Sequence, residues 1–195
     1  SDKHYVLQIY TEDCTGCGLC ATVCPTKEKS LQRIAKPEDA TAEKDNVAFF
    51  ETLPYEDREQ LNFTSVKDAQ YLQPFFEFSC ACAGCGETPY VKLVSQLFGD
   101  RMIIGDACGC SSVFGGSFPS PWAVDTKGRG PAWSSSLFED NAEFAFGFVL
   151  SEDKHRSYAQ ELLTKLAKEI GEELAQSILN ATQTNEIEIN QQRAR

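Results

Sequence analysis

Cys14-Thr-Gly-Cys17-Gly-Leu-Cys20-Ala-Thr-Val-Cys24-Pro25 is the most informative part of the chain. Its cysteines are separated by two, two and three residues and followed by proline, which is the spacing of the bacterial iron–sulfur run. Gly16 and Gly18 let the backbone curl close to the sulfides of a cluster, so that three thiolates on one tight loop can bind it. The run therefore predicts a [4Fe–4S] site.

We expect Cys14, Cys17 and Cys20 to bind one cluster and Cys24 to bind another. The fourth cysteine begins a turn that points away from the other three, and in two-cluster ferredoxins it ligates the neighbouring cluster. A zinc knuckle is the main alternative, but it prefers separated cysteine pairs or Cys/His mixtures. Disulfides are less favoured, because nine cysteines cannot all pair within one chain.

Composition narrows the class of protein further. The chain has 195 residues, 42% of them hydrophobic and 24% charged, as expected for one or two globular domains. Its net charge of −11, without a Lys/Arg stripe, disfavours nucleic acid as a partner. We find no signal-peptide pattern and no apolar run of roughly 20 residues, so we expect a cytoplasmic protein that does not bind membranes. Cysteines in that reducing compartment serve metal or redox chemistry.

Residue patterns predict three regions along the chain. Residues 4–10 read as a strand that leads into the first cysteine group. Residues 37–70 are acidic and polar, as expected of a surface connector. In residues 71–195 we expect a helix over 88–98 that stops at Gly99, a short strand near 101–105 and an ordered loop over 115–147, with Trp122 and Trp133 as its anchors. A long helix should then begin with Ser151 as its N-cap and continue through Ile178.

Two further cysteine groups follow. Cys80-Ala-Cys82-Ala-Gly-Cys85-Gly86-Glu87 places a C-x-x-C turn before a helix, and Gly109-Cys110 comes directly after a strand. A lone C-x-x-C is a weak signal, compatible with a zinc half-site or a thioredoxin-like redox pair. Ser111 and Ser112 have no nearby histidine base, so serine nucleophile chemistry has no support.

Two sets of segments carry a resemblance to a known family. Cys14 to Cys24, continued by Pro25-Thr-Lys-Glu-Lys-Ser, resembles the second cluster motif in the ferredoxin-like domain of pyruvate:ferredoxin (flavodoxin) oxidoreductases. The start of the thiamine-diphosphate domain of the same enzymes is similar to Phe76-Glu-Phe-Ser to Gly86-Glu87-Thr, Gly99-Asp-Arg-Met, Gly109-Cys110-Ser-Ser, Gly128-Arg-Gly-Pro-Ala-Trp133-Ser and Leu137-Phe-Glu-Asp-Asn141-Ala-Glu-Phe. The resemblance thus covers nearly the whole chain. Because the first cluster motif would lie upstream, we expect this chain to be an internal fragment.

The resemblance implies an α/β fold with two incomplete parts. Residues 1–36 would form an α+β ferredoxin-like [4Fe–4S] segment and residues 37–70 the connector. Residues 71–195 would form the N-terminal part of an α/β thiamine-diphosphate-binding domain. A stand-alone ferredoxin-like electron-transfer module without catalysis is the alternative.

The resemblance also implies a function and further site residues. The complete enzyme would be a homodimer that oxidatively decarboxylates pyruvate on thiamine diphosphate with Mg²⁺, transfers the acyl group to coenzyme A, and passes electrons through [4Fe–4S] clusters to ferredoxin or flavodoxin. Cys82, Cys85 and Cys110 would hold the cluster nearest the thiamine cofactor, and Glu87 and Cys110 would contact that cofactor. No magnesium–pyrophosphate motif is completed after Gly105-Asp106-Ala107. We therefore expect no catalytic residue in this chain and no activity from it alone.

Cys80 and Cys108 depart from the family pattern, in which we expect glycine and threonine. Each lies two residues before a proposed ligand, and in an extended backbone that spacing puts both side chains on one face. They could act as a substitute ligand, form a mutual disulfide, or be buried thiols that pack as small apolar groups. We favour buried, passive thiols, since free cysteine is commonly found as a buried small hydrophobe.

Overall fold

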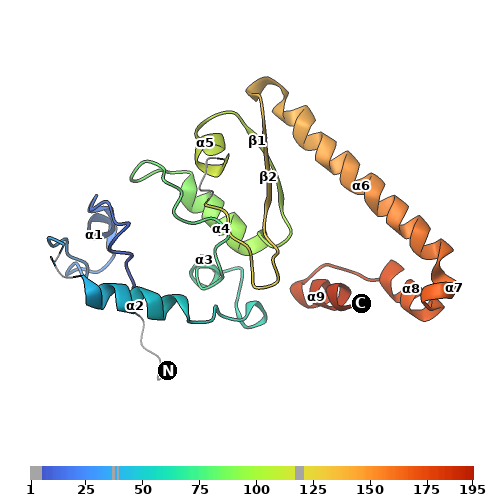
Figure 1. The fold of residues 1–195 in the computed structure, drawn as a ribbon, viewed down its shortest axis with the longest axis horizontal. Helices are drawn as coiled ribbons and strands as arrows, with labels where there is room; N and C mark the ends of the chain where they lie inside the picture. Colours follow the sequence, from blue (N-terminus) through green and yellow to red (C-terminus); the bar gives the residue numbers. More distant parts are fainter. Residues whose placement is uncertain (1–5, 37, 39, 117–120) are drawn as a thin grey trace. The chain divides into compact units, whose positions relative to one another are not determined.

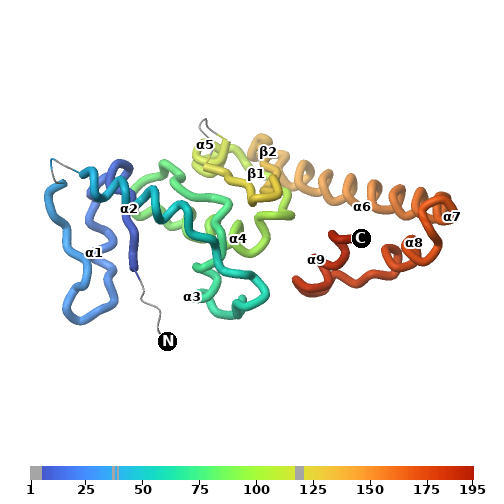
Figure 2. Tube along the Cα trace, turned by 60° about the horizontal axis from the view of Figure 1, so that its bottom comes forward, coloured from blue at the N-terminus to red at the C-terminus, as the bar shows by residue number. Residues whose placement is uncertain are grey.

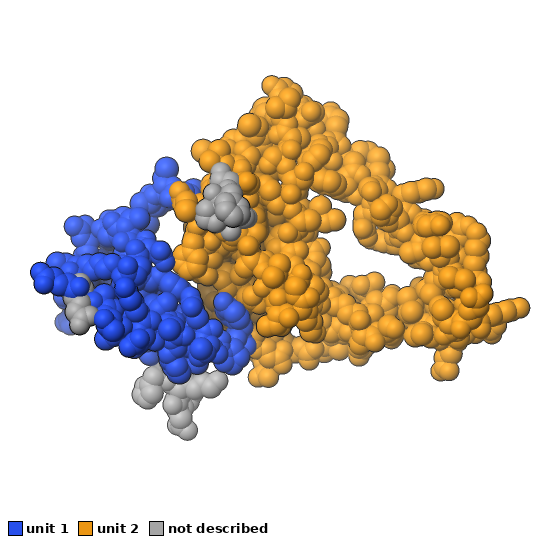
Figure 3. Space-filling view, in the orientation of Figure 1, with its two compact units in different colours: residues 1–55, 81–86 blue, residues 56–80, 87–195 orange. Residues whose placement is uncertain are grey.

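The computed structural model describes residues 6–36, 38, 40–116 and 121–195 (Figure 1). The chain divides into two compact units, coloured separately in Figure 3. Unit 1 contains residues 1–55 and 81–86, and unit 2 contains residues 56–80 and 87–195. Helices together with a small parallel sheet make this an α/β structure, as the sequence predicts.

Unit 1 is built from two helices and the loops around them. Helix α1 spans Leu19–Val23 and α2 spans Thr41–Glu51. The rings of Tyr10 and of Phe50 in α2 form a T-shaped pair, with 6.3 Å between ring centroids. Residues 6–10, the described part of the predicted strand 4–10, form no strand, so that prediction is wrong for these residues. The predicted connector contains α2, because its Thr41–Glu51 stretch has no Pro or Gly to stop a helix.

A two-stranded parallel sheet organises unit 2. Strand β1 spans Ile103–Ala107 and β2 spans Ala132–Ser136, with Ile103 opposite Ala132 and Ala107 opposite Ser136. Parallel strands require a crossover, and here it includes helix α5, Cys110–Gly116 (Figure 1). The strand predicted near residues 101–105 is thus confirmed and runs to Ala107.

Aromatic side chains form the core beside this sheet. Phe76 is almost completely buried, and its ring lies 4.7 Å from Trp122 and 5.6 Å from Phe114, centroid to centroid. The Trp122 ring packs against the Trp133 ring in a tilted arrangement, 5.3 Å between centroids, and Trp122 donates its Nε1 hydrogen to the Gly115 carbonyl at 2.8 Å. These contacts confirm that both tryptophans anchor the glycine-rich region. The region is not one loop, however, since it contains the end of α5, strand β2 and the start of the next helix.

Helix α4, Thr88–Phe98, has the bounds that the apolar spacing predicts and ends at Gly99. Its buried Gln96 donates to the Leu72 carbonyl at 2.9 Å. Arg58, in the 3₁₀ helix Arg58–Gln60, donates to the carbonyls of Gln96 and Leu97, each at 2.7 Å. A cation at a helix C-terminus satisfies orphan carbonyls and complements the helix dipole. The short helix α3, Val66–Ala69, precedes this core.

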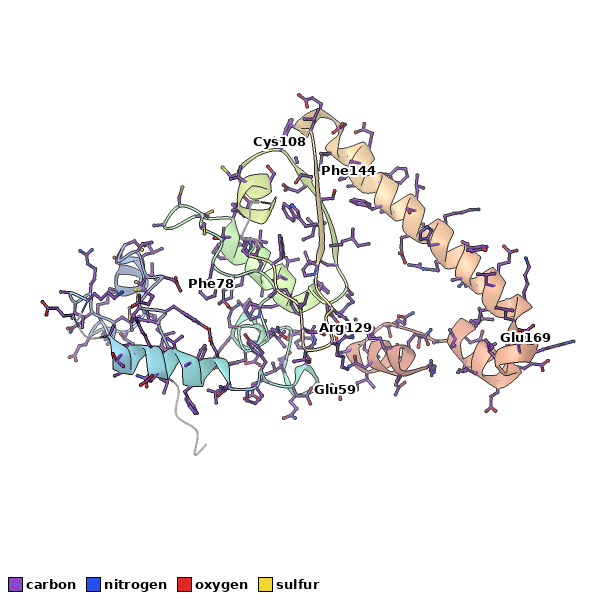
Figure 4. The ribbon with its side chains drawn as sticks, in the orientation of Figure 1. Glu59, Phe78, Cys108, Arg129, Phe144 and Glu169 are labelled. Carbon is purple, nitrogen blue, oxygen red and sulfur yellow. The ribbon has the colours of Figure 1, made fainter. Side chains whose placement is uncertain are left out.

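The long C-terminal helix begins earlier than the sequence predicts. After the 3₁₀ turn Phe138–Asp140, α6 runs over Asn141–Lys165, so the expected start at Ser151 is wrong. The early turns form because Ala145 and Phe148 pack against Gly105 of β1, where an added Cβ would lie 3.1 Å from the Ala145 Cβ. Phe144, which is labelled in Figure 4, also contacts Phe148 of the same helix, with 4.8 Å between ring centroids.

The structure has three helices, α6, α7 and α8, where the sequence predicts one continuous helix through Ile178. Helix α7 spans Ala167–Ile170 and α8 spans Glu172–Leu179, separated by Gly171 at φ 102° (Figure 2). Helix α9, Glu186–Ala194, joins the α4 region through ion pairs. Arg193 lies 2.7 Å from Asp100, and Glu186 pairs with Arg58 at 3.3 Å and Arg101 at 3.4 Å.

Candidate metal centre

The first cysteine group lies on a loop that leads into α1. Gly16 and Gly18 have φ of 68° and 78°, the left-handed conformation that favours glycine, and Gly18 is the N-cap of α1. Cys14 and Cys17 precede the helix, Cys20 lies within it, and all three are exposed. Cys24 is the C-cap residue and is only 7% exposed. The loop therefore presents three accessible thiols and one buried thiol.

The turn after α1 surrounds Cys24 with hydrogen-bond donors. The Cys24 sulfur lies 3.1 Å from the Thr26 hydroxyl, which is itself 3.0 Å from the Ser30 hydroxyl. The Thr26 side chain, with the backbone N–H groups of Thr26, Ser30 and Leu31, lowers the pKa of the Cys24 thiol to about 7, although burial acts in the opposite direction. Thiolate is the form of cysteine that binds metals. The hydrogen bonds of this turn thus stabilise an anionic sulfur at Cys24.

Two basic residues lie at the two ends of α1. The Lys29 ammonium donates to the carbonyls of Cys24 at 2.6 Å and Thr22 at 3.0 Å, at the helix C-terminus. Arg33 lies beside Gly18 at the other end, where its Nη1 would be 3.7 Å from an added Cβ. Our sequence reasoning did not single out Lys29. Its position five residues after the last cysteine of the run was the available signal.

The second cysteine group belongs to the same unit as the first. Residues 81–86 are part of unit 1, where the Cys85 N–H donates to the Cys82 carbonyl at 3.0 Å. Gly84 has φ 75°, and a Cβ added there would lie 3.7 Å from Leu19 of α1. Cys82 is exposed and Cys85 half-buried. The C-x-x-C turn and the first cysteine loop are therefore neighbours, although more than fifty residues separate them in the sequence.

The third group lies in unit 2, at the carboxyl end of β1. The Cys108 N–H donates to the Ser136 carbonyl at 3.0 Å, and Cys110 is the first residue of α5 (Figure 4). Ser111 donates to Asp106 at 2.7 Å, which leaves that hydroxyl engaged with a carboxylate. Glu87 precedes α4 as its N-cap residue, exposed and with no side-chain capping bond. Arg129 forms a structural ion pair with Asp125 at 2.8 Å.

The expectation that Cys80 and Cys108 are buried is wrong, because both are exposed. Cys80 has φ 55°, a conformation that glycine adopts without the cost a Cβ imposes. That backbone agrees with the glycine expected here by resemblance. None of the nine cysteines forms a disulfide, so the expected alternative of a Cys80–Cys108 disulfide is not present.

The donor set suits an iron–sulfur cluster, although the ligands do not converge. Across the described part of the chain, no three Cys, His, Asp or Glu side chains come together in a group that could hold a metal ion. The chemistry of the set still fits a cluster, with soft thiolate ligands, two left-handed glycines in the loop and a buried sulfur surrounded by donors. The assignment of individual ligands remains a prediction.

No helix of the described residues has the length and apolar character needed to cross a bilayer. The model of the 4Fe-4S binding domain matches residues 7–27, which include the whole first cysteine group.

Three relatives match most or all of the chain. The pyruvate-flavodoxin oxidoreductases of Nostoc sp. and Rhodospirillum rubrum are each 50% identical to it, over 100% and 98% of its length. The pyruvate:ferredoxin oxidoreductase of Moorella thermoacetica is 54% identical over 83% of it. The aligned region is 17%, 16% and 14% of these proteins, respectively. By homology over nearly its whole length, the chain therefore belongs to the pyruvate-flavodoxin and pyruvate:ferredoxin oxidoreductase family.

Proposed function

We propose that this chain supplies part of the electron relay of an enzyme that oxidatively decarboxylates pyruvate with coenzyme A. The observation that carries the proposal is the 4Fe-4S match at residues 7–27, within a chain about half identical to pyruvate oxidoreductases. Electrons would leave through [4Fe–4S] clusters to flavodoxin or ferredoxin, the carriers in the relatives' names.

We assign the ligands as the sequence predicts. Cys14, Cys17 and Cys20 would hold one cluster and Cys24 would contribute to a second. Their support is the spacing, the left-handed glycines and the donors around Cys24. Cys82, Cys85 and Cys110 would hold the cluster nearest thiamine diphosphate, which the family resemblance supports.

The residues of this chain would bind and orient, while the bound groups supply the redox and carbanion chemistry. Thr26 and the N–H groups of the following turn favour the thiolate form of Cys24, since they lower its pKa to about 7. Exposure of Cys14, Cys17 and Cys20 would leave their cluster accessible to a carrier protein. Glu87 and Cys110 would contact thiamine diphosphate, and the chain would contribute no catalytic residue.

The remaining assignments are also proposals. We place the protein in the cytoplasm as part of a homodimer, with no nucleic-acid or membrane partner. The net charge of −11 supports the first exclusion, since phosphates would be repelled.

Spectroscopy of the anaerobically reconstituted protein tests the cluster assignment. Iron–sulfur clusters should give broad absorption near ~400 nm, whereas zinc is a d¹⁰ ion and stays silent. Stoichiometric zinc without that absorption would overturn the proposal. In the protein at its full native length, pyruvate and coenzyme A should reduce flavodoxin or ferredoxin, with chelation of iron abolishing the reaction.

The 4Fe-4S match alone also suits a stand-alone electron-transfer module. That function predicts carrier reduction after chemical reduction of the protein at its full native length, but none with pyruvate and coenzyme A. The same assay thus separates the two functions.

Glu87 offers a second, narrower test. Glu87→Gln should weaken thiamine-diphosphate affinity in the full-length protein if the side chain contacts the cofactor. Unchanged cofactor affinity and kinetics would leave Glu87 only the role of a first-turn acidic residue, worth about 0.3–1 kcal/mol of helix stability.

A further inference from the structure

We infer that Lys29 sets the reduction potential of the cluster bound through Cys24, by holding a fixed positive charge beside that ligand. The inference rests on the proposed function in one respect, namely that Cys24 binds a cluster. It concerns a residue for which neither the spacing of the cysteines nor the family resemblance gives a role.

The position of the Lys29 ammonium is defined by two contacts. It donates to the Cys24 carbonyl at 2.6 Å and to the Thr22 carbonyl at 3.0 Å, reaching back five and seven residues. Two of its three hydrogens are thus used. A lysine held in this way keeps its charge in one place, whereas an ordinary surface lysine samples many rotamers.

Helix capping explains the contacts but not all of their consequences. The last carbonyls of α1 need donors, and a cation there also complements the helix dipole. Any capping side chain would meet that need. A cation has the further effect of stabilising negative charge nearby, and each reduction adds one electron to a cluster.

Several features keep this charge effective at Cys24. Lys29 itself is exposed, but Cys24 is only 7% exposed and the contact between the Lys29 ammonium and the Cys24 carbonyl is partly buried. Solvent therefore screens this contact less than it screens a charge that lies wholly in water. Thr26 lies 3.1 Å from the same sulfur. Hydrogen bonds to ligand sulfurs and local charge are both established determinants of cluster potential.

Lys27 and Glu28 are the other charged residues of the same turn. They are exposed to solvent, as Lys29 is, but Lys29 differs from them in the two hydrogen bonds that hold its ammonium. Lys27 carries the same charge two residues earlier, so Lys27→Gln is a matched control for a general change in surface charge.

The test is a redox titration of the anaerobically reconstituted protein at its full native length, followed by cluster-resolved EPR. Lys29→Gln should lower the equilibrium constant for reduction of the Cys24 cluster roughly tenfold, which is about 59 mV for a one-electron couple. Lys29→Arg should stay close to the wild type because it keeps the charge. Lys27→Gln should change the constant less than about threefold, since the Lys27 charge is not held against the Cys24 carbonyl and solvent screens it.

Equal shifts in Lys29→Gln and Lys27→Gln, or no shift in Lys29→Gln with its iron intact, would overturn the inference. Lys29→Met provides a second neutral variant in case Lys29→Gln loses iron. If both neutral variants lose the cluster, Lys29 has a structural role and the inference is wrong. A wild-type protein without iron–sulfur absorption would instead refute the proposed function, which is a separate result.

Discussion

Cys24 and Cys110 are both predicted cluster ligands, but the chain surrounds them in different ways. Cys24 is buried in a turn whose donors come from the next few residues, Thr26 to Leu31. Cys110 is exposed at the start of a seven-residue helix. That helix is held by contacts of its far end with Trp122 and Trp133. One ligand thus has a locally built environment, while the other depends on residues distant in sequence.

This difference predicts which substitutions act locally and which act through the fold. Changes in the Cys24 turn should affect a cluster with little effect on folding. Changes around α5 should affect the stability of unit 2 first.

Replacement of Cys24 should produce the largest effect. In the protein at its full native length, Cys24→Ala should damage the cluster next to the one held by Cys14, Cys17 and Cys20, because the fourth cysteine points away from these three. Cluster-resolved EPR should show that the first cluster keeps nearly all its iron. Loss of the first cluster with retention of its neighbour would reverse the assignment, and Cys20→Ala is the matched variant expected to give that pattern.

Gly115→Ala tests the dependence of the Cys110 helix on tertiary packing. An added Cβ would lie 2.6 Å from the Trp133 ring, so the variant should lose about 1–3 kcal/mol of unfolding free energy. Denaturant unfolding measures the loss. Gly116→Ala is the control, since its Cβ would lie 3.5 Å from Trp133 Nε1, an ordinary contact distance. Equal stability of the two variants would show that α5 tolerates this crowding.

Asp125, in the segment between α5 and β2, makes a contribution to the folding stability that depends on pH. Burial raises its pKa, but the Arg129 N–H and guanidinium and the Lys127 N–H outweigh burial and lower it overall. Because the folded pKa is lowered, this stabilisation is complete above the unfolded value of about 3.9 and is lost as pH falls through the folded pKa.

Asp125→Asn should therefore cost about 1–3 kcal/mol near pH 7. The difference from the wild type should shrink below a pH of about 4. Urea midpoints across this range measure it. Asp153→Asn is the exposed control, with a smaller effect that varies little with pH. If Asp125→Asn lost the same unfolding free energy at every pH, the charge of Asp125 would not be the cause of the loss.

The smallest effect is expected from the double variant Cys80→Gly, Cys108→Thr. Both thiols are exposed, and a predicted passive role means that iron content and the EPR signal of the cluster next to thiamine should persist. Glycine at φ 55° also relieves a left-handed backbone cost of roughly 1–2 kcal/mol. Cys80→Ala retains that cost and is the control. Loss of the cluster signal in the double variant would identify one of these thiols as a ligand.

Features set by residues close together in the sequence were predicted correctly, whereas a feature set by a distant contact was missed. Helix α4 has the predicted bounds because its apolar spacing and Gly99 are local signals. The start of α6 was missed because Ala145 and Phe148 are helical where they pack against Gly105, about forty residues earlier. Gly147 and the aromatic residues before it had suggested a loop when viewed without that partner.

The cysteine spacing by itself determined the chemistry of the first group, since ligand type, the number of intervening residues and left-handed glycines are local properties. Tertiary structure alone decided that Cys108 and Cys110 are exposed, and that the Cys82–Cys85 turn lies beside α1. Burial depends on residues far apart in the chain, such as Trp122 and Trp133 around Gly115. The sequence pattern does not predict which of these residues pair, because the hydrophobic effect is non-directional and any apolar partner satisfies it.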